Sequence, residues 1–330
     1  MRINPGLRVI SLTDGSVCIG SGAGGLWIDG LDDADRAFIA RFAKDSGTSD
    51  RLPSGLAPER EQELLAVLTP VLVPEDDFRL PGTRASTLAP DIAQWSAAYG
   101  RHAGSSVQRR ARAVVRLHGL DRCGQTVASL LAAAGVGTVA LCDPGIVDPG
   151  DLGSGPFRLA DLGMPRTRAL SRSLARAWPH TRFPEWAPRF GGTPQEADAT
   201  VAVARDWLRE DVAGHLAQSP IPHLRVLFTD AGARVGPLVI PGLTPCLDCA
   251  PSHTMPAPVA PACAVSPTSP EISIAAAAAG MAVMQLLMLV DGVNVPAAAG
   301  SVLCLDLGTG AATHEPVVAR PGCLCLARAA

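Results

Sequence analysis

Residues 113–143 read AVVRLHGLDRCGQTVASLLAAAGVGTVALCD, and this stretch decides the fold class. Ala113–His118 is an apolar run typical of a buried strand, and Gly119–Gly124 has the composition of a turn. Gln125–Ala134 is an Ala- and Leu-rich helix, and Gly137–Cys142 is a second apolar strand that ends on Asp143. A strand, a helix and a second strand within about thirty residues form a βαβ unit. The stretch therefore predicts an α/β fold with a Rossmann-like, doubly wound parallel sheet.

Further elements of the same kind follow this unit. The sequence predicts helices at Arg166–Ala177 and Trp207–Ala217, strands at Ala199–Val203 and Leu224–Thr229, and a C-terminal hairpin over 301–319. The apolar run Ile272–Val290 is borderline in length for a membrane span. Five consecutive alanines weaken its hydrophobicity, and acidic Glu271 and Asp291 flank it without basic anchors. We therefore expect a buried helix and no contact with a membrane.

Composition bounds the class of protein. The 330 residues are 47% hydrophobic and 18% charged, which is enough for about two domains with buried cores. The net charge of −3 gives no general attraction to nucleic acid. Lys44 is the single lysine, so a site that needs a cation must use arginine or a metal. No signal peptide is visible at Met1–Ile10, and an odd number of cysteines, nine, argues against a secreted disulfide framework. We expect a cytoplasmic protein.

The N-terminal part reads as a separate small module. Three short strands, Leu7–Ser11, Val17–Gly20 and Leu26–Ile28, precede a helix from Asp32 to about Lys44, and a second helix begins at Pro58 and runs to about Leu72. This order predicts a winged-helix-like module over residues 1–85. Residues 86–106 form a linker with one helix, and the α/β domain occupies residues 107–330.

Four cysteines have the spacing of a metal site. Cys246 and Cys249 form a Cys-x-x-Cys pair, and Cys323 and Cys325 form a Cys-x-Cys pair near the end of the sequence. Four thiolates with no obvious position for water are typical of structural zinc. The alternatives are four unrelated buried thiols or a redox dithiol, and neither has a supporting context.

The turn Gly119–Gly124 is a candidate nucleotide site. Glycines let backbone N–H groups approach phosphates there, and Asp143, nineteen residues beyond Gly124, lies where an acid binds the ribose hydroxyls. However, Asp121, Arg122 and Cys123 fill the middle of the turn. Asp121 would repel a phosphate, so the alternative is a remnant turn without a nucleotide. Asp143 alone also leaves open an NAD(P)-binding protein.

Cys263 lies in a Pro-rich loop between Cys249 and the long helix. A lone cysteine on such a loop can accept a thioester or persulfide, although no base lies close except His253. The simpler interpretation is an incidental loop residue.

With these residues in place, the stretch from Arg112 to Cys325 resembles the ThiF/MoeB/HesA adenylyltransferases of the ubiquitin-activating-enzyme-like superfamily. The resemblance is carried by the glycine turn, by the segments 131–141, 143–152 and 161–163, and by Pro241–Cys249. It implies adenylation of a C-terminal carboxylate with ATP and magnesium, and a homodimer with a Cys-bound zinc.

Position by position, this apparatus is incomplete. The central glycines of the turn are absent, and the family's Ser-Asn-Leu-x-Arg-Gln segment reads Gly150–Gly155 here, without its arginine. The family's phosphate-binding lysine aligns with Arg166, and its magnesium-binding Asp falls near Asp206. These losses predict a degenerate member of the superfamily.

This pattern looks like actinobacterial ThiF-like proteins in which a PqqD-like recognition element precedes a degenerate scaffold. The resemblance implies a leader-peptide-binding protein that presents a ribosomally made precursor (a RiPP) to a modifying enzyme such as a YcaO cyclodehydratase. The alternative is an active adenylyltransferase that uses Asp143, Arg166 and Asp206 for ATP and magnesium, with Cys263 as an acceptor.

An open sheet edge in the N-terminal module would bind such a peptide as an added strand. We place that edge at Leu26, Trp27 and Ile28, and the wall of the groove at Leu64, Leu65 and Leu68. These residues could equally be core. DNA binding by the module is disfavoured because its second helix carries Glu59, Glu61 and Glu63.

Overall fold

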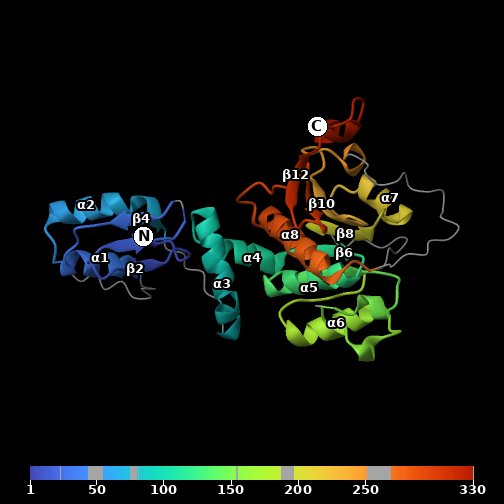
Figure 1. The fold of residues 1–330 in the computed structure, drawn as a ribbon, viewed down its shortest axis with the longest axis horizontal. Helices are drawn as coiled ribbons and strands as arrows, with labels where there is room; N and C mark the ends of the chain where they lie inside the picture. Colours follow the sequence, from blue (N-terminus) through green and yellow to red (C-terminus); the bar gives the residue numbers. More distant parts are fainter. Residues whose placement is uncertain are drawn as a thin grey trace. The chain divides into compact units, whose positions relative to one another are not determined.

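The computed structural model describes residues 1–22, 24–43, 55–74, 80, 82–153, 155–186, 197–250 and 269–329. The chain divides into two compact units, Met1–Val107 and Gln108–Ala330. Figure 1 labels their helices and strands. Each unit is described below by itself.

Three short antiparallel strands form the sheet of the N-terminal unit. β2 (Val9–Ser11), β3 (Val17–Ile19) and β4 (Leu26–Ile28) lie in the order β2-β3-β4, while β1 (Arg2–Ile3) pairs separately with β5 (Leu72–Val73). An Asp-Gly turn, Asp14-Gly15, joins β2 to β3. The Asp14 carboxylate accepts a hydrogen bond from Ser16 N at 2.9 Å, and Gly15 has a φ of 88°, which glycine adopts without strain. The three predicted strands are confirmed.

Two helices and a 3₁₀ turn pack against this sheet: α1 (Asp33–Ala43), α2 (Pro58–Leu68) and η1 (Thr69–Val71). α3 (Gly82–Tyr99) and α4 (Gly104–Arg112) follow, and α4 runs across the division into the second unit. Ile19, Phe38 and Ile39 form the core with Leu64 and Leu68. The helix expected within the linker 86–106 is α3, which begins earlier, at Gly82, and contains Pro90 in its interior.

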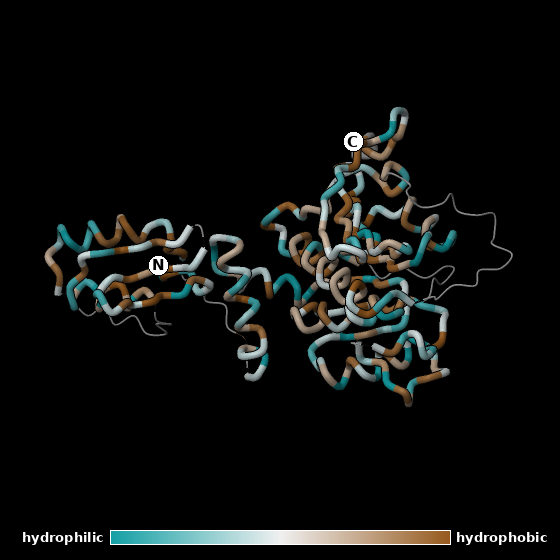
Figure 2. The backbone as a smooth tube through the Cα atoms, viewed as in Figure 1, coloured by the Kyte–Doolittle hydropathy of each residue, from teal (hydrophilic) through white to brown (hydrophobic). Residues whose placement is uncertain are grey.

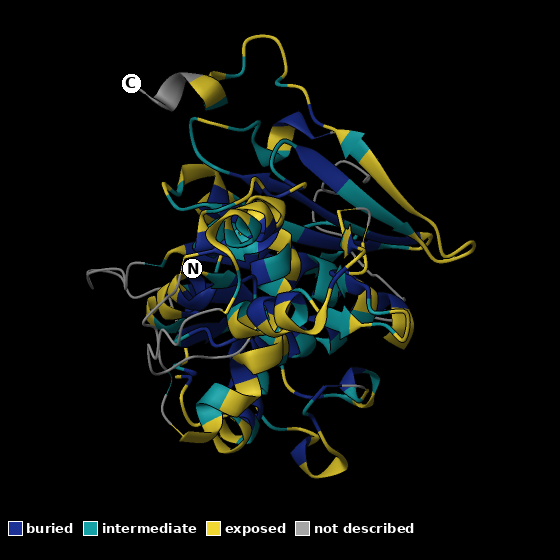
Figure 3. Cartoon of the chain, turned by 90° about the vertical axis from the view of Figure 1, so that its left-hand side faces the viewer, coloured by how far each residue is buried: buried dark blue, intermediate teal, exposed yellow. Residues whose placement is uncertain are grey.

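The second unit contains a seven-stranded sheet in the order β12-β11-β10-β9-β8-β6-β7. The strands are β6 (Val114–His118), β7 (Thr138–Cys142), β8 (Ala199–Arg205), β9 (His223–Thr229), β10 (Gly232–Val239), β11 (Ser301–Asp306) and β12 (Ala312–Pro316). Strands β7, β6, β8 and β9 are parallel, and the remaining pairs are antiparallel. Figure 3 shows burial concentrated in the inner strands, while β12 is mostly exposed.

The predicted parallel sheet is therefore mixed. β10 was not predicted, because Gly232, Gly236 and Pro237 interrupt its apolar pattern. The βαβ unit at 113–143 is present as expected, with α5 (Arg122–Ala133) between β6 and β7. The other helices are α6 (Arg166–Ala177), α7 (Glu210–Gln218) and α8 (Ile272–Asp291), with short 3₁₀ turns η2 (Pro149–Asp151), η3 (Leu159–Asp161), η4 (Leu247–Cys249) and η5 (Leu324–Ala329).

The apolar helix α8 lies against α5 and against strands β9 and β10 (Figure 1). In the described part of the chain it is the one helix long and apolar enough to cross a membrane, and half of its most apolar window is buried within the protein. Its alanines Ala275, Ala278, Ala279 and Ala282 are buried. Figure 2 shows this helix as a largely hydrophobic segment. α8 is thus a core helix, because small side chains allow it to approach α5 closely.

Candidate functional site

A crevice opens where the parallel strands β6, β7 and β8 end. The chain leaves β6 toward β7 on one side and returns through β8 on the other, so the crevice lies at the point where the strand order reverses. It contains a cavity of about 750 Å³ whose lining includes Gly119, Asp143 and Arg166. Open α/β sheets bind ligands at this position, so the predicted Gly119, Asp143 and Arg166 come together as expected of a ligand site.

The turn before α5 is capped by its own acid. Asp121 is the N-cap residue, and one of its carboxylate oxygens accepts hydrogen bonds from Cys123 N at 2.9 Å and Gly124 N at 3.1 Å. These are the amides at the positive end of the helix dipole that could otherwise bind an anion. The sequence prediction began the helix at Gln125 and missed this capping role.

Asp121 is half-buried in the turn. Burial raises its pKa from the ordinary 3.8 to about 6, although the hydrogen bonds from Gly124 and Cys123 work in the opposite direction. The carboxylate is therefore negatively charged at neutral pH at a position where a bound phosphate would also carry charge.

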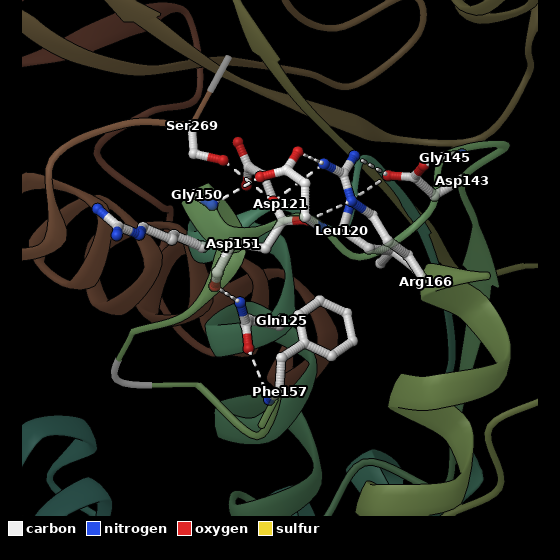
Figure 4. Close-up of polar contacts among 12 residues, drawn as sticks. Leu120, Asp121, Gln125, Asp143, Gly145, Gly150, Asp151, Phe157, Arg166 and Ser269 are labelled. Atoms are coloured by element: carbon white, nitrogen blue, oxygen red, sulfur yellow. Dashed lines mark hydrogen bonds and ion pairs between the residues drawn. The ribbon is translucent and has the colours of Figure 1, made fainter. Parts of the chain in front are cut away.

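Arg166, at the start of α6, is held by carboxylates. Its Nε and Nη2 donate to the two carboxylate oxygens of Asp151 at 2.8 and 2.9 Å, and Asp143 and Asp148 lie at 3.5 and 3.4 Å (Figure 4). Asp151 is fully buried. Burial alone would lower the pKa of Arg166, but the Asp151 ion pair raises it overall.

Asp143 is engaged by the backbone around it. Its carboxylate accepts hydrogen bonds from Leu120 N at 2.6 Å and from Gly145 N at 2.7 Å. Figure 4 shows these contacts beside Arg166. Asp143 thus ties the end of β7 to the turn after β6, whether or not a ribose binds.

The two glycines of the turn have packing reasons of their own. A Cβ at Gly119, where φ is +81°, would lie 2.3 Å from Val203 O, and a Cβ at Gly124 would lie 1.9 Å from Gly119 O. Both positions exclude any other residue because the backbones touch. Their presence follows from the packing of the turn and does not by itself require a phosphate.

An aromatic and imidazole cluster lines the other side of the crevice. The Arg116 guanidinium lies 4.1 Å from the centre of the Trp186 ring, and its Nη1 is 3.0 Å from His215 Nε2. His118 contacts the edge of Trp186, and burial lowers the pKa of His118 to about 4. His118 is therefore neutral at pH 7. The sequence had no signal for Trp186 or His215, because they lie far from the βαβ unit in the chain.

Asp206, which the alternative hypothesis assigns to catalysis, does not line the crevice cavity. Asp206 follows β8 directly with a φ of 59°, a left-handed conformation that is uncommon outside glycine. Its carboxylate is 3.8 Å from Arg205 Nε. Cys263 lies outside the described residues.

The four predicted cysteines converge. The Sγ atoms of Cys246, Cys249, Cys323 and Cys325 all lie within 4.8 Å of one another, with neighbouring separations of 3.7, 3.8 and 3.9 Å. Tetrahedral zinc with Zn–S bonds of ~2.3 Å requires sulfur atoms ~3.8 Å apart. Arg320 N also donates to the Cys249 sulfur at 3.3 Å, which stabilises a thiolate. The cluster is compatible with a zinc site.

The N-terminal unit exposes only part of the predicted peptide groove. β4 pairs with β3 alone among the described strands, so its other edge is open. Trp27 is 55% exposed and Leu26 and Leu65 are half-buried. Leu64 and Leu68 are 3% and 0% exposed and Ile28 is 9% exposed, so these three side chains belong to the core of the unit and cannot line an open groove.

Comparison with known proteins identifies the fold. Residues 97–198 match the ThiF family. The chain is similar to Escherichia coli MccB solved with AMPCPP and MccA, with 16% identity over 98% of both chains and a TM-score of 0.75. It is also similar to E. coli MccB with ATP, with 16% identity over 98% of this chain and 99% of that one and a TM-score of 0.74.

A third solved structure, PaaA, has 19% identity over 94% of this chain and 98% of that one, with a TM-score of 0.71. No curated protein sequence matches the chain. At these identities the likeness establishes a shared fold. The chain therefore contains a ThiF family region within a ThiF-like α/β fold.

Proposed function

We propose that this chain is a leader-peptide-binding scaffold that presents a ribosomally made precursor peptide to a separate modifying enzyme, such as a YcaO cyclodehydratase. In this proposal the chain is a degenerate member of the superfamily, and its crevice does not adenylate the peptide. The observation that carries the proposal is the capping of α5 by Asp121.

The cap uses backbone amides that a phosphate at this turn would need. An ATP phosphate at the turn would need Cys123 N and Gly124 N, and both already donate to Asp121. A phosphate there would also lie beside a half-buried carboxylate, and like charges repel strongly away from water. Binding would require the cap to move and the amides to change partner.

Arg166 is not free to balance the negative charge of a bound phosphate. Arg166 would have to leave Asp151, a buried carboxylate, to reach a phosphate. Removing one partner from a buried ion pair costs about 3–5 kcal/mol. The chain's single lysine is Lys44, and an arginine, Arg166, stands where the resemblance places the family's phosphate lysine. Phosphate binding is thus disfavoured at both groups that would have to supply it.

Peptide binding is assigned to the open edge of β4. A peptide added there would form backbone hydrogen bonds with 26–28, and alternate side chains would contact Trp27, Leu26 and Leu65, which are accessible. Ile28, Leu64 and Leu68 support this surface from beneath. The MccB structure that contains MccA shares its fold with nearly the whole of this chain. This likeness supports a precursor peptide as the partner of this chain.

We further propose that the four cysteines hold one structural zinc ion. A structural site with four protein ligands would hold the segment after β10 against the C-terminal residues, and has no open position for catalysis. We also expect a homodimer in the cytoplasm that binds no nucleic acid.

The competing function is an active adenylyltransferase acting on a peptide or small-protein carboxylate. The crevice at the strand ends and its Asp143 favour this function, as does the fold shared with MccB bound to ATP. It would use Asp143, Arg166 and Asp206 for ATP and magnesium.

ATP-dependent pyrophosphate exchange separates the two functions. We expect no exchange above background with the zinc-loaded chain and a precursor peptide, and no saturable ATP binding at millimolar concentration. Asp121→Gly, which frees the two amides, should increase ATP affinity, whereas the surface control Asp230→Gly should not. Robust exchange by the unaltered chain would reject the scaffold proposal.

A further inference from the structure

A second cavity of about 480 Å³ lies on the α7 face of the sheet, and its size falls in the range of small-molecule pockets. α7, strands β9 and β10 and the cysteine cluster enclose it. Leu208 lines both this cavity and the crevice, so the two are neighbours. The apolar part of its wall comes from Leu216, Leu227 and Val239.

Arg225 places a positive charge in this apolar wall. It lies in the middle of β9, where His223, Arg225 and Leu227 alternate toward the cavity. Among the described residues its guanidinium makes one long hydrogen bond, from Nε to Gly236 O at 3.4 Å. In the part of the chain that the structure describes, no carboxylate lies within 4.0 Å of its guanidinium.

The surroundings of Arg225 make that charge costly without an anion. Burial and the neighbouring Arg234 lower its pKa to about 10, and Asp248 on the cavity wall opposes this only partly. Arg234 itself is paired with Glu315. Arg225 is half-buried, and the planar fork of an arginine in such a position binds an oxyanion with two hydrogen bonds.

The entrance to the cavity is apolar and accessible. Leu324, which lines it, is 71% exposed, and Leu243, between the lining residues Gly242 and Thr244, is 72% exposed. Large exposed aliphatic side chains around a pocket are typical of a binding site for an apolar group.

We propose that this cavity binds a carboxylate with an apolar body, with Arg225 binding the carboxylate and the α7 wall enclosing the body. A singly charged group fits better than a phosphate, because Asp248 and the cysteine cluster, once it holds zinc, surround the cavity with negative charge. The source is either the C-terminal end of a peptide or a free apolar acid. If the carboxylate is the end of a peptide, the inference rests on the proposed function. If it is a free acid, the inference is independent of that function.

Calorimetric titration of the zinc-loaded full chain tests the site with three probes: N-acetyl-leucine, its amide, and octanoate. We expect N-acetyl-leucine or octanoate to bind, and the amide to bind at least about tenfold more weakly because it cannot form the charge-assisted pair. Tighter binding of N-acetyl-leucine assigns the site to peptide ends, and tighter binding of octanoate assigns it to free acids.

Two variants locate the site. Arg225→Gln should weaken acid binding about tenfold or more, and Ala213→Leu, which narrows the cavity from α7, should weaken it with Arg225 intact. The exposed Arg176→Gln on α6 is the matched control and should have no effect. Zinc content and leader-peptide binding should stay unchanged in all three variants, so a failure here is distinguishable from a failure of the scaffold proposal.

Three results would overturn the inference. They are no acid binding at millimolar concentration, equal binding of the acid and its amide, and loss of zinc in Arg225→Gln, which would assign the arginine to the metal centre.

Discussion

Replacing Asp121 with Asn separates the charge of the N-cap from its hydrogen bonds. The amide oxygen of Asn caps a helix about as well as a carboxylate, so Cys123 N and Gly124 N keep their acceptor. The substitution removes only the titrating group whose pKa burial raises from 3.8 to about 6.

The sign of the pH effect follows from proton binding. Between pH 4 and 6 the folded protein holds a proton on Asp121 that the unfolded chain has lost, so folding stability falls as the pH rises through this window. The folded-state pKa of Asp121 lies about two pH units above its ordinary value, which corresponds to a loss of folding stability of ~3 kcal/mol. The whole of this loss is present above the folded-state pKa. About half of this penalty already exists at pH 5, so the Asn variant should gain ~1.5 kcal/mol relative to the unaltered chain between pH 5 and pH 8.

Calorimetric melting of the zinc-loaded protein measures this difference. For a unit of about 200 residues, 1 kcal/mol shifts Tm by ~2–4 °C, so the Tm advantage of the Asn variant should grow by ~3–6 °C from pH 5 to pH 8. Asp121→Ala serves as a control, because it loses the cap as well and should be ~1 kcal/mol less stable than Asn at every pH. An advantage of Asn that is flat or shrinks with rising pH would refute the assignment of a half-buried, charged cap.

Three further predictions concern other parts of the chain. Purified protein should carry about one zinc ion per chain by atomic absorption, and Cys249→Ser or Cys323→Ser should release it and lower Tm; metal-free protein of equal stability would contradict the zinc site. Asp291→Asn removes the carboxylate charge that pairs with the fully buried Arg110 and should cost ~3–5 kcal/mol in unfolding experiments, most of it recovered by Arg110→Met with Asp291→Leu. Trp27→Ala should weaken the binding of a labelled leader peptide in fluorescence anisotropy without changing Tm, because Trp27 is exposed; unchanged affinity would contradict the β4 edge.

Local patterns were sufficient for much of the fold. The βαβ unit, the three N-terminal strands and α6 were predicted because each depends on neighbours within a few residues, such as a run or alternation of apolar residues. β10 and the mixed sheet were not predicted, since glycine and proline hide a strand whose pairing with β9 and β11 is tertiary.

The cysteine cluster was also predicted, because a Cys-x-x-Cys pair together with a Cys-x-Cys pair is typical of a metal site. The open edge of β4 was anticipated, but Leu64, Leu68 and Ile28 proved to be core, since a sequence cannot distinguish an apolar side chain beneath a groove from one that lines it. Whether such a side chain is buried depends on which helices and strands pack against it in the folded protein.

The sequence by itself determined the fold class, the four converging cysteines and the loss of glycines at the turn. Tertiary structure alone decided what replaced them. Asp121 became a cap on the amides of α5, Arg166 became the partner of buried Asp151, and Arg225 came to lie in an apolar cavity. The physical reason is that the role of a charged side chain depends on which partner lies within about 3 Å of it, and these partners come from distant segments brought together only by folding.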